Sequence, residues 1–399
     1  MKITHVECHV LLVPDYDTQA CSSAQDDLVV EVHTDEGLIG IGETDTNPWV
    51  ARECIRARGT HCMGLGLQEM LLGADPLQPE AVWNRLYSGS KMTGRRGAVI
   101  CAMGAIDMAL WDIRGQAAGK PVWRLLNEHR GRDGTDAGPR PVVPYASLLA
   151  TGNTVDTQCA SLIEKALTAQ AMGFRAAKLE VCINGPYSHN GLQEDDESVV
   201  EMVAACREAV GPEFTLMVDV AYAWPDAERA LSVLEQLAPH DLFFVETPID
   251  IDDLDGYARL AERSPIRIAA GEWQNTHWEF EDLADRGKLA VLQPDVGRVG
   301  GFTEAVKVCR IAEQRDRLIV PHCWKSMIGI AASAHLAATT EACRFVEFLP
   351  AKLSESPLRR ELVRQEFELV NGQILLGERP GLGIDLDRQA LERFVDAAG

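Results

Sequence analysis

The chain has 399 residues, of which 46% are hydrophobic and 25% charged, so it is long enough to bury a large core and to form two domains. Its formal net charge of −22 argues against nucleic acid and anionic membrane surfaces as partners, because both would repel it. The eleven cysteines include no CxxC pair, and no apolar run reaches the roughly 18 residues that span a membrane. We therefore expect a cytoplasmic protein with reduced thiols and a soluble small molecule as its partner.

The first 130 residues change from one periodicity to another. Apolar and polar residues alternate up to about residue 45, with a turn signal at Thr34–Gly37, and this predicts an antiparallel meander. The polar loop Pro14–Asp27 interrupts it, and loops of this kind often carry specificity. From 47 to 127 apolar residues recur at three and four positions, which predicts helices. Residues 1–130 are thus expected to form an α+β domain, with its boundary in the Gly- and Pro-rich stretch 129–141.

Residues 141–352 alternate between strand-like and helix-like segments. The predicted strands are 142–147, 175–181, 215–219, 242–246, 267–272, 290–295, 317–322 and 344–348. Eight such units fit the α/β class, as a (β/α)8 barrel of the TIM type. The last segment, 353–399, returns to short strands and turns, and we expect it to pack back on the N-terminal domain and share in a capping domain.

Three consecutive predicted strands end on a carboxylate, Asp219, Glu246 and Glu272. A parallel barrel brings the carboxyl ends of its strands to one rim, so these side chains should converge. A single carboxylate in such a place is more often a helix N-cap or a solvated loop charge. Three together offer the hard oxygen ligands that Mg²⁺ prefers, whereas the Cys and His ligands typical of zinc are missing from these positions. The pattern predicts a magnesium site.

The next two strands end on Asp295 and His322, which should be neighbours on the rim. An aspartate that accepts a hydrogen bond from one imidazole nitrogen fixes the tautomer and raises the basicity of the other, so His322 is a candidate general base. The alternative is a buried hydrogen-bonded pair without chemistry. His335, inside an apolar helical segment, is expected to be structural.

The second predicted barrel strand carries Lys178 and Glu180, which the strand period of two places on one face. Inside a barrel that face points to the centre. Two charges buried there are costly unless they pair with each other or with a ligand. Either the two form a structural ion pair, or they reach the substrate.

The chain resembles the enolase superfamily, and within it the mandelate racemase / muconate lactonizing enzyme family, over nearly its full length. The resemblance is carried, in order, by TDEGLIGIGET, AIDMALWDIRGQAAGKPVWRLL, VDVAYAW, FVETP, AAGEW, LQPDVGRVGGFTEA, VPHCW and PGLGIDLD. It implies Mg²⁺ as the cofactor on the three strand-end carboxylates, the Asp295–His322 pair as base or acid, and Glu347 hydrogen-bonded to the carboxylate of a sugar acid substrate. The superfamily removes a proton alpha to a carboxylate through an enediolate. A homo-oligomer is also the family's habit.

One departure from the family bears on the reaction. Family members commonly carry Lys-x-Lys on the second barrel strand, with the second lysine as a base opposite the histidine, and here that position is Glu180. Unless Lys178 takes over, His322 is the evident base. This favours dehydration of an acid sugar, an aldonate or aldarate, to a 2-keto-3-deoxy acid, in which His322 also protonates the departing hydroxide. A second departure is Ala221, where the family often has asparagine.

The alternatives within the family are a racemase or epimerase and a lactone cycloisomerase. From a different class, the chain could be a non-catalytic binding barrel, which its complete set of ligands and its histidine disfavour. We expect substrate choice to depend on the Pro14–Asp27 loop, on Asn47 and Trp49, and on the Asn184–Gly191 rim.

Overall fold

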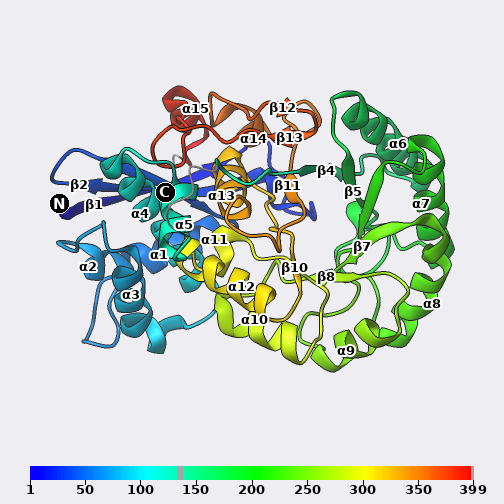
Figure 1. The fold of residues 1–399 in the computed structure, drawn as a ribbon, viewed down its shortest axis with the longest axis horizontal. Helices are drawn as coiled ribbons and strands as arrows, with labels where there is room; N and C mark the ends of the chain where they lie inside the picture. The colour runs from blue at the N-terminus through cyan, green and yellow to red at the C-terminus, as the bar shows by residue number, and fades with distance from the viewer. Residues whose placement is uncertain (133–137, 397–399) are drawn as a thin grey trace.

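The computed structural model describes residues 1–132 and 138–396, which form a capping domain and a barrel (Figure 1). The capping sheet has the order β1 (Ile3–Leu12), β2 (Asp26–Thr34) and β3 (Ile39–Thr44), with both pairs antiparallel. The predicted meander is confirmed. Gly37 in the turn between β2 and β3 has a φ of +82°, a conformation that favours glycine. The loop between β1 and β2 holds one short 3-10 helix, η1 (Ser23–Gln25).

The helices of the capping domain are α1 (Pro48–Arg56), α2 (Leu67–Leu71), α3 (Pro79–Gly94), α4 (Ala98–Ala118) and α5 (Val122–His129). The central helix α4 is buried over nearly its whole length, because it packs on β3 and on the barrel. Glycines allow both approaches. A Cβ at Gly40 would lie 2.0 Å from the Ala109 carbonyl oxygen, and one at Gly104 would lie 2.1 Å from the Gly297 carbonyl oxygen.

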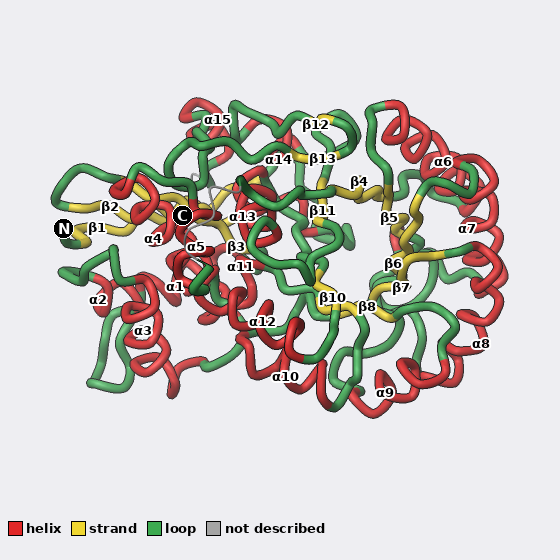
Figure 2. The backbone as a smooth tube through the Cα atoms, in the orientation of Figure 1, coloured by secondary structure: helices red, strands yellow, loops and turns green. Residues whose placement is uncertain are grey.

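Eight parallel strands form the second sheet, in the order β10-β9-β8-β7-β6-β5-β4-β11 (Figure 2). They are β4 (Pro144–Leu149), β5 (Ala176–Glu180), β6 (Thr215–Asp219), β7 (Leu242–Glu246), β8 (Ile268–Ala270), β9 (Val291–Leu292), β10 (Leu318–Ile319) and β11 (Val346–Phe348). A bridge between Ile319 and Cys343 joins the two ends of the sheet. The α/β fold class and the (β/α)8 barrel with a capping domain are confirmed.

Helices alternate with these strands around the outside of the barrel. They are α6 (Val155–Ala171), α7 (Asp196–Val210), α8 (Ala227–Leu237), α9 (Leu254–Arg263), α10 (Thr276–Asp285), α11 (Val296–Val299), α12 (Phe302–Gln314) and α13 (Met327–Ala337). An apolar cluster fills the barrel interior and includes Tyr145, Met217 and Phe244. Because inward-facing residues recur every second position, the inward residues nearer the strand ends form the rim above this cluster.

The strands β8 to β10 are shorter than predicted, because the backbone turns before the predicted functional residues are reached. Gly271, with a φ of +126°, bends the chain after β8. Asp295 is the N-cap of α11 and accepts hydrogen bonds from the backbone N–H groups of Gly297 and Arg298. Glu272, Asp295 and the following histidine therefore stand in loops just above the sheet.

The C-terminal segment contains α14 (Pro357–Glu361), β12 (Leu369–Val370), β13 (Gln373–Ile374) and α15 (Arg388–Phe394). It touches both lobes of the molecule, the capping domain and the barrel: Val395 bridges to Leu11 of the capping sheet, and Ile374 bridges to Val142 before the first barrel strand. The predicted boundary at 129–141 includes residues 133–137, which lie outside the described residues. Within the described residues, no helix is long and apolar enough to cross a membrane.

Candidate active site

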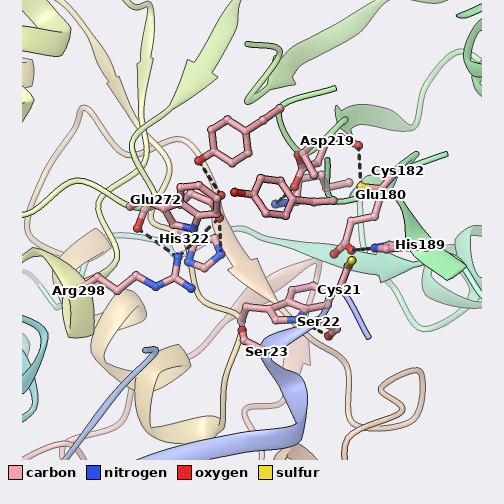
Figure 3. Close-up of a pocket in the computed structure, with 16 residues that line it drawn as sticks. Cys21, Ser22, Ser23, Glu180, Cys182, His189, Asp219, Glu272, Arg298 and His322 are labelled. Atoms are coloured by element: carbon pink, nitrogen blue, oxygen red, sulfur yellow. Dashed lines mark hydrogen bonds and ion pairs between the residues drawn. The ribbon is translucent and has the colours of Figure 1, made fainter. Parts of the chain in front are cut away.

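A pocket of about 230 Å³ opens at the carboxyl ends of the barrel strands (Figure 3). Both lobes line it. The residues are Cys21, Ser22, Ser23, Lys178, Glu180, Cys182, Tyr187, His189, Asp219, Ala221, Tyr222, Glu272, Trp273, Arg298, His322 and Trp324. The Pro14–Asp27 loop thus reaches the site, as does the Asn184–Gly191 rim. Asn47 lines a neighbouring cavity that shares Arg298 with the pocket, whereas Trp49 donates its indole N–H to Asp396 at the far end of the chain.

The three strand-end carboxylates stand on neighbouring elements of the rim. Asp219 on β6 and Glu246 on β7 are register partners, and Glu272 follows β8. Glu246 is completely buried; its Oε2 accepts a hydrogen bond of 2.6 Å from the amide of Gln293. Burial raises the pKa of Glu246 to about 8, although Lys178 opposes the shift.

Lys178, on β5, is the cation at the centre of this group. Its Nζ lies 2.9 Å from Glu246 Oε1, 2.9 Å from Glu347 Oε1 and 3.7 Å from Asp219 Oδ2. The first interpretation of the second strand, an ion pair between Lys178 and Glu180, is wrong, because the two side chains do not pair. The lysine instead links the carboxylates of three other strands.

Glu347, on β11, is fully buried and held on both oxygens. Its Oε1 accepts from Ser147 at 2.6 Å, and its Oε2 accepts from the backbone N–H of Cys323 at 2.8 Å. Burial opposes ionisation, but Lys178 and His322 keep the pKa of Glu347 below its usual value. Glu347 is therefore an anion fixed against the rim.

His322 lies between two carboxylates. Its Nδ1 is 2.8 Å from Asp295 Oδ2, and its Nε2 is 3.1 Å from Glu272 Oε2. Burial alone would lower the pKa of His322, but the carboxylates of Glu347, Asp295 and Glu272 raise it to about 9. Asp295 and His322 are brought together as the sequence predicted, and the second ring nitrogen faces the pocket beside Glu272 (Figure 3).

Glu180, at the end of β5, lies on another side of the pocket. Its Oε2 is 3.7 Å from Nε2 of His189, which comes from the loop after the strand. Both residues are buried, with 8% of each exposed. Sequence reasoning placed this loop at the rim but did not single out His189, because a lone histidine in a polar loop carries no signal of its own.

Arg298 is a second residue that sequence reasoning missed. It is buried between the lobes, ion-paired with Asp45 of the capping domain, and its Nη1 lies 3.8 Å from Glu272 Oε2. Its position in the first turn after the N-cap Asp295 could have marked it as a rim residue. Tyr222, which donates to Glu272 Oε1 at 2.9 Å, was also missed.

The donor set fits a divalent cation. Carboxylates outnumber cationic groups around the pocket: the acids are Glu180, Asp219, Glu246, Glu272, Asp295 and Glu347, and the cations are Lys178, Arg298 and protonated His322. The raised pKa of Glu246 also reflects this excess of acidic groups, because burial and the neighbouring carboxylates disfavour its ionised form. Added positive charge would relieve this excess, and carboxylate oxygens are the ligands that Mg²⁺ prefers.

Comparisons with known proteins agree with this geometry. Residues 161–390 match the family model described as enolase C-terminal domain-like, and residues 6–127 match the N-terminal domain of mandelate racemase / muconate lactonizing enzyme. The chain therefore belongs to the enolase superfamily, in the mandelate racemase / muconate lactonizing enzyme family, and is an enzyme of that superfamily.

Individual relatives carry the names of more than one reaction. The chain is 32% identical to D-galactarolactone cycloisomerase of Agrobacterium fabrum, over 99% of each chain. It is 30% identical to D-galactonate dehydratase of Klebsiella pneumoniae, over 90% of this chain and 88% of the relative. A solved structure of a racemase from Streptomyces coelicolor with bound magnesium superposes with a TM-score of 0.81, at 27% identity, covering 99% of this chain and 100% of the other.

Proposed function

We propose that this enzyme removes the proton alpha to the carboxylate of a sugar acid with the help of Mg²⁺, and then eliminates the β-hydroxyl group to give a 2-keto-3-deoxy acid. The observation that carries the proposal is the position of His322, held by Asp295 and directed into a pocket whose wall includes Glu272 and Asp219. Relatives named as dehydratases of sugar acids support the substrate class.

Asp219, Glu246 and Glu272 are the residues that would hold the ion. A bound Mg²⁺ would supply positive charge that stabilises the charge developing on the substrate carboxylate. With Glu272 among its ligands, the Glu272 carboxylate would no longer hold a proton on His322 Nε2. His322 then removes the α-proton at Nε2, while Asp295 keeps the proton on Nδ1 and balances the imidazolium that forms. A base placed in this way contributes about 10²- to 10⁴-fold to the rate.

Lys178, Glu347 and Glu180 complete the proposed catalytic set. Lys178 lies on the pocket wall, and its ammonium group can donate to the substrate carboxylate as well as to Glu246. Glu347 fixes Lys178 and the substrate end of the site. Glu180 is the acid that stands where the family often has a second lysine.

A lactone cycloisomerase is the second candidate, because one wall of the pocket suits a ring. The rings of Tyr222 and Trp273 stack with centroids 4.4 Å apart, and Tyr187 meets Trp273 edge-on at 5.4 Å. Trp273 is 42% exposed although it lines the pocket. Exposed aromatic faces of this kind provide a flat apolar surface for a cyclic substrate. Two relatives are named as cycloisomerases.

The deciding experiment is a screen of aldonic acids, aldaric acids and their lactones with the Mg²⁺-loaded enzyme. We expect a 2-keto product from at least one acyclic acid. Product spectra in D₂O separate the alternatives: exchange of the α-proton with the hydroxyl retained indicates an epimerase, and an isomeric product formed from lactones alone indicates a cycloisomerase. No exchange and no product from any sugar acid or lactone would overturn the proposal.

A further inference from the structure

Two pairs of a carboxylate and an imidazole stand at the rim of the barrel, and the proposed reaction gives a proton-transfer step to only one of them. Asp295 and His322 lie at the carboxyl ends of β9 and β10. Glu180 and His189 lie at the end of β5 and in the loop after it. Around the barrel, two strands (β4 and β11) lie between β5 and β10 in one direction. Four strands (β6 to β9) lie between them in the other direction. Figure 3 accordingly shows Glu180 and His189 on the opposite side of the pocket from His322.

The second pair is built into the fold. The backbone N–H of His189 donates to the Cys182 carbonyl at 2.7 Å, which ties the start of η2 (His189–Gly191) to the end of β5. Asn190 anchors the same turn by donating its amide to the Gly152 carbonyl at 2.7 Å. Ligand atoms of Glu180, Cys182 and His189 all lie within 4.8 Å of one another. The imidazole is therefore held at the carboxylate by the backbone around it.

The pair is also incompletely satisfied. The 3.7 Å between Glu180 Oε2 and His189 Nε2 is too long for a direct hydrogen bond, and no hydrogen bond to the Glu180 side chain occurs within the described residues. His189 Nδ1 is buried without a hydrogen-bond partner. Buried polar groups normally have partners, so a His189 Nδ1 without one and a Glu180 carboxylate that accepts no hydrogen bond, on two residues that line the pocket, point to a ligand group. A hydroxyl group, which both accepts and donates, matches these two side chains.

We infer that Glu180 and His189 form a second proton-transfer pair, which binds the departing hydroxyl of the substrate and protonates it from the side opposite His322. The inference rests on the proposed function and changes one step of it, since His322 would no longer protonate the leaving group. After His322 has taken the α-proton, the C–O bond breaks with its electrons on oxygen. That oxygen takes a proton from the carboxyl group of Glu180 and leaves as water, and the enol tautomerises to the 2-keto acid. Glu180 touches the oxygen, and His189 is its positioning residue.

The test separates the two halves of the reaction. In D₂O, we expect the wild-type enzyme to exchange the α-proton and to form product from its sugar acid. We expect Glu180→Gln to lower product formation about 10²-fold or more while α-exchange stays within a few-fold of the wild type. Retained exchange also shows that the variant is folded. His189→Ala is expected to behave in the same way.

The double variant tests whether the two residues work as one unit. We expect Glu180→Gln with His189→Ala to be no slower than the slower single variant, because groups that act together are not additive. His240→Ala is the matched control, since His240 ends η3 (Ala238–His240) before β7, at the other end of the barrel, and should leave both rates unchanged.

Three outcomes would overturn the inference. Equal loss of exchange and product in Glu180→Gln would overturn the inference, because Glu180 would then serve proton abstraction. Unchanged product formation in either single variant would overturn it as well, and so would additive losses in the double variant. Failure of the wild-type enzyme to exchange the α-proton of any sugar acid is a different result, which overturns the proposed function itself.

Discussion

Two buried histidines of this chain stand in opposite electrostatic surroundings. His322, after β10, lies between the carboxylates of Asp295 and Glu272, and its pKa is raised to about 9. His335, inside α13, has Nδ1 3.2 Å from the backbone N–H of Trp123 and Nε2 3.1 Å from the Leu382 carbonyl, and burial lowers its pKa to about 4. The comparison teaches that the charge of the partners, more than burial, decides whether an imidazole can carry a proton. His335 serves packing, whereas His322 can serve chemistry.

The largest effect is expected from removing the acidic surroundings of His322. Glu272→Gln takes away one partner of the imidazole and one proposed Mg²⁺ ligand, so we expect turnover to fall by about 10³-fold or more, the rate equivalent of several kcal/mol. Removing metal with EDTA should have the same effect on the wild type and be reversed by added Mg²⁺. Turnover by 2-keto acid formation is the measurement.

Glu279→Gln is the matched control for that substitution. Glu279, on α10, pairs with Arg96 at 2.8 Å away from the pocket lining, and its loss should leave turnover nearly unchanged. Full activity of the wild type in EDTA would contradict the metal-dependent mechanism.

The next largest effect is expected from substituting His322, with the substitution of His335 as its counterpart. His322→Asn should lower both α-proton exchange and product formation by about 10²- to 10⁴-fold, because it removes the base. His335→Gln should leave both rates near the wild-type values at neutral pH. Full turnover in His322→Asn, measured in parallel by NMR in D₂O, would mean that another group is the base.

A smaller effect is expected from Asp295→Asn. The amide cannot balance the imidazolium, and it can turn either an acceptor or a donor towards Nδ1, so we expect a loss of about 10²-fold. Because the carboxylate raises the pKa of His322, its removal should shift the corresponding limb of the pH–rate profile to lower pH. Asp285→Asn, which removes a surface pair with Arg315, is the control. An unchanged profile in Asp295→Asn would show that the pair does not titrate as one unit.

The distinction between the two histidines was predictable from the sequence, and so was most of the fold. An apolar run that ends on Asp219, Glu246 or His322 predicts a strand, and the polar residue marks the strand end that lies at the rim. The apolar pattern around His335 predicts a buried helix. Strand lengths were less predictable, because Gly271 and the N-cap Asp295 bend the chain before the hydrophobic run suggests it.

The partners of Lys178 and Arg298 could not be predicted, because strand order alone does not fix them. Lys178 reaches Glu246 and Glu347 rather than Glu180, and Arg298 pairs with Asp45 across the two lobes. Such partners depend on how strands and lobes approach in space, and one sequence contains no record of that distance. The Glu180–His189 pair belongs to the same group, since the loop that carries His189 is placed by backbone hydrogen bonds to Cys182 and Gly152.

The smallest expected effect concerns stability and sharpens the contrast from the side of His335. Its folded-state pKa of about 4 lies below the roughly 6.5 of an exposed histidine. In that interval the unfolded chain binds the proton and the folded chain does not, so stability from this group is fully present above pH 6.5 and is lost as pH falls towards 4. Lowering the pH from 7.5 to 5.0 should therefore cost the wild type about 2 kcal/mol of unfolding free energy through His335 alone.

His335→Gln keeps a donor and an acceptor for Leu382 and Trp123 but cannot titrate, so its unfolding free energy in urea should fall by about 2 kcal/mol less than that of the wild type over the same pH step. His61→Gln, at an exposed histidine of the capping domain, should follow the wild type. An equal fall in the wild type and His335→Gln would mean that the imidazole in α13 is not held neutral, and that the main-chain partners of His335 do not set it apart from His322.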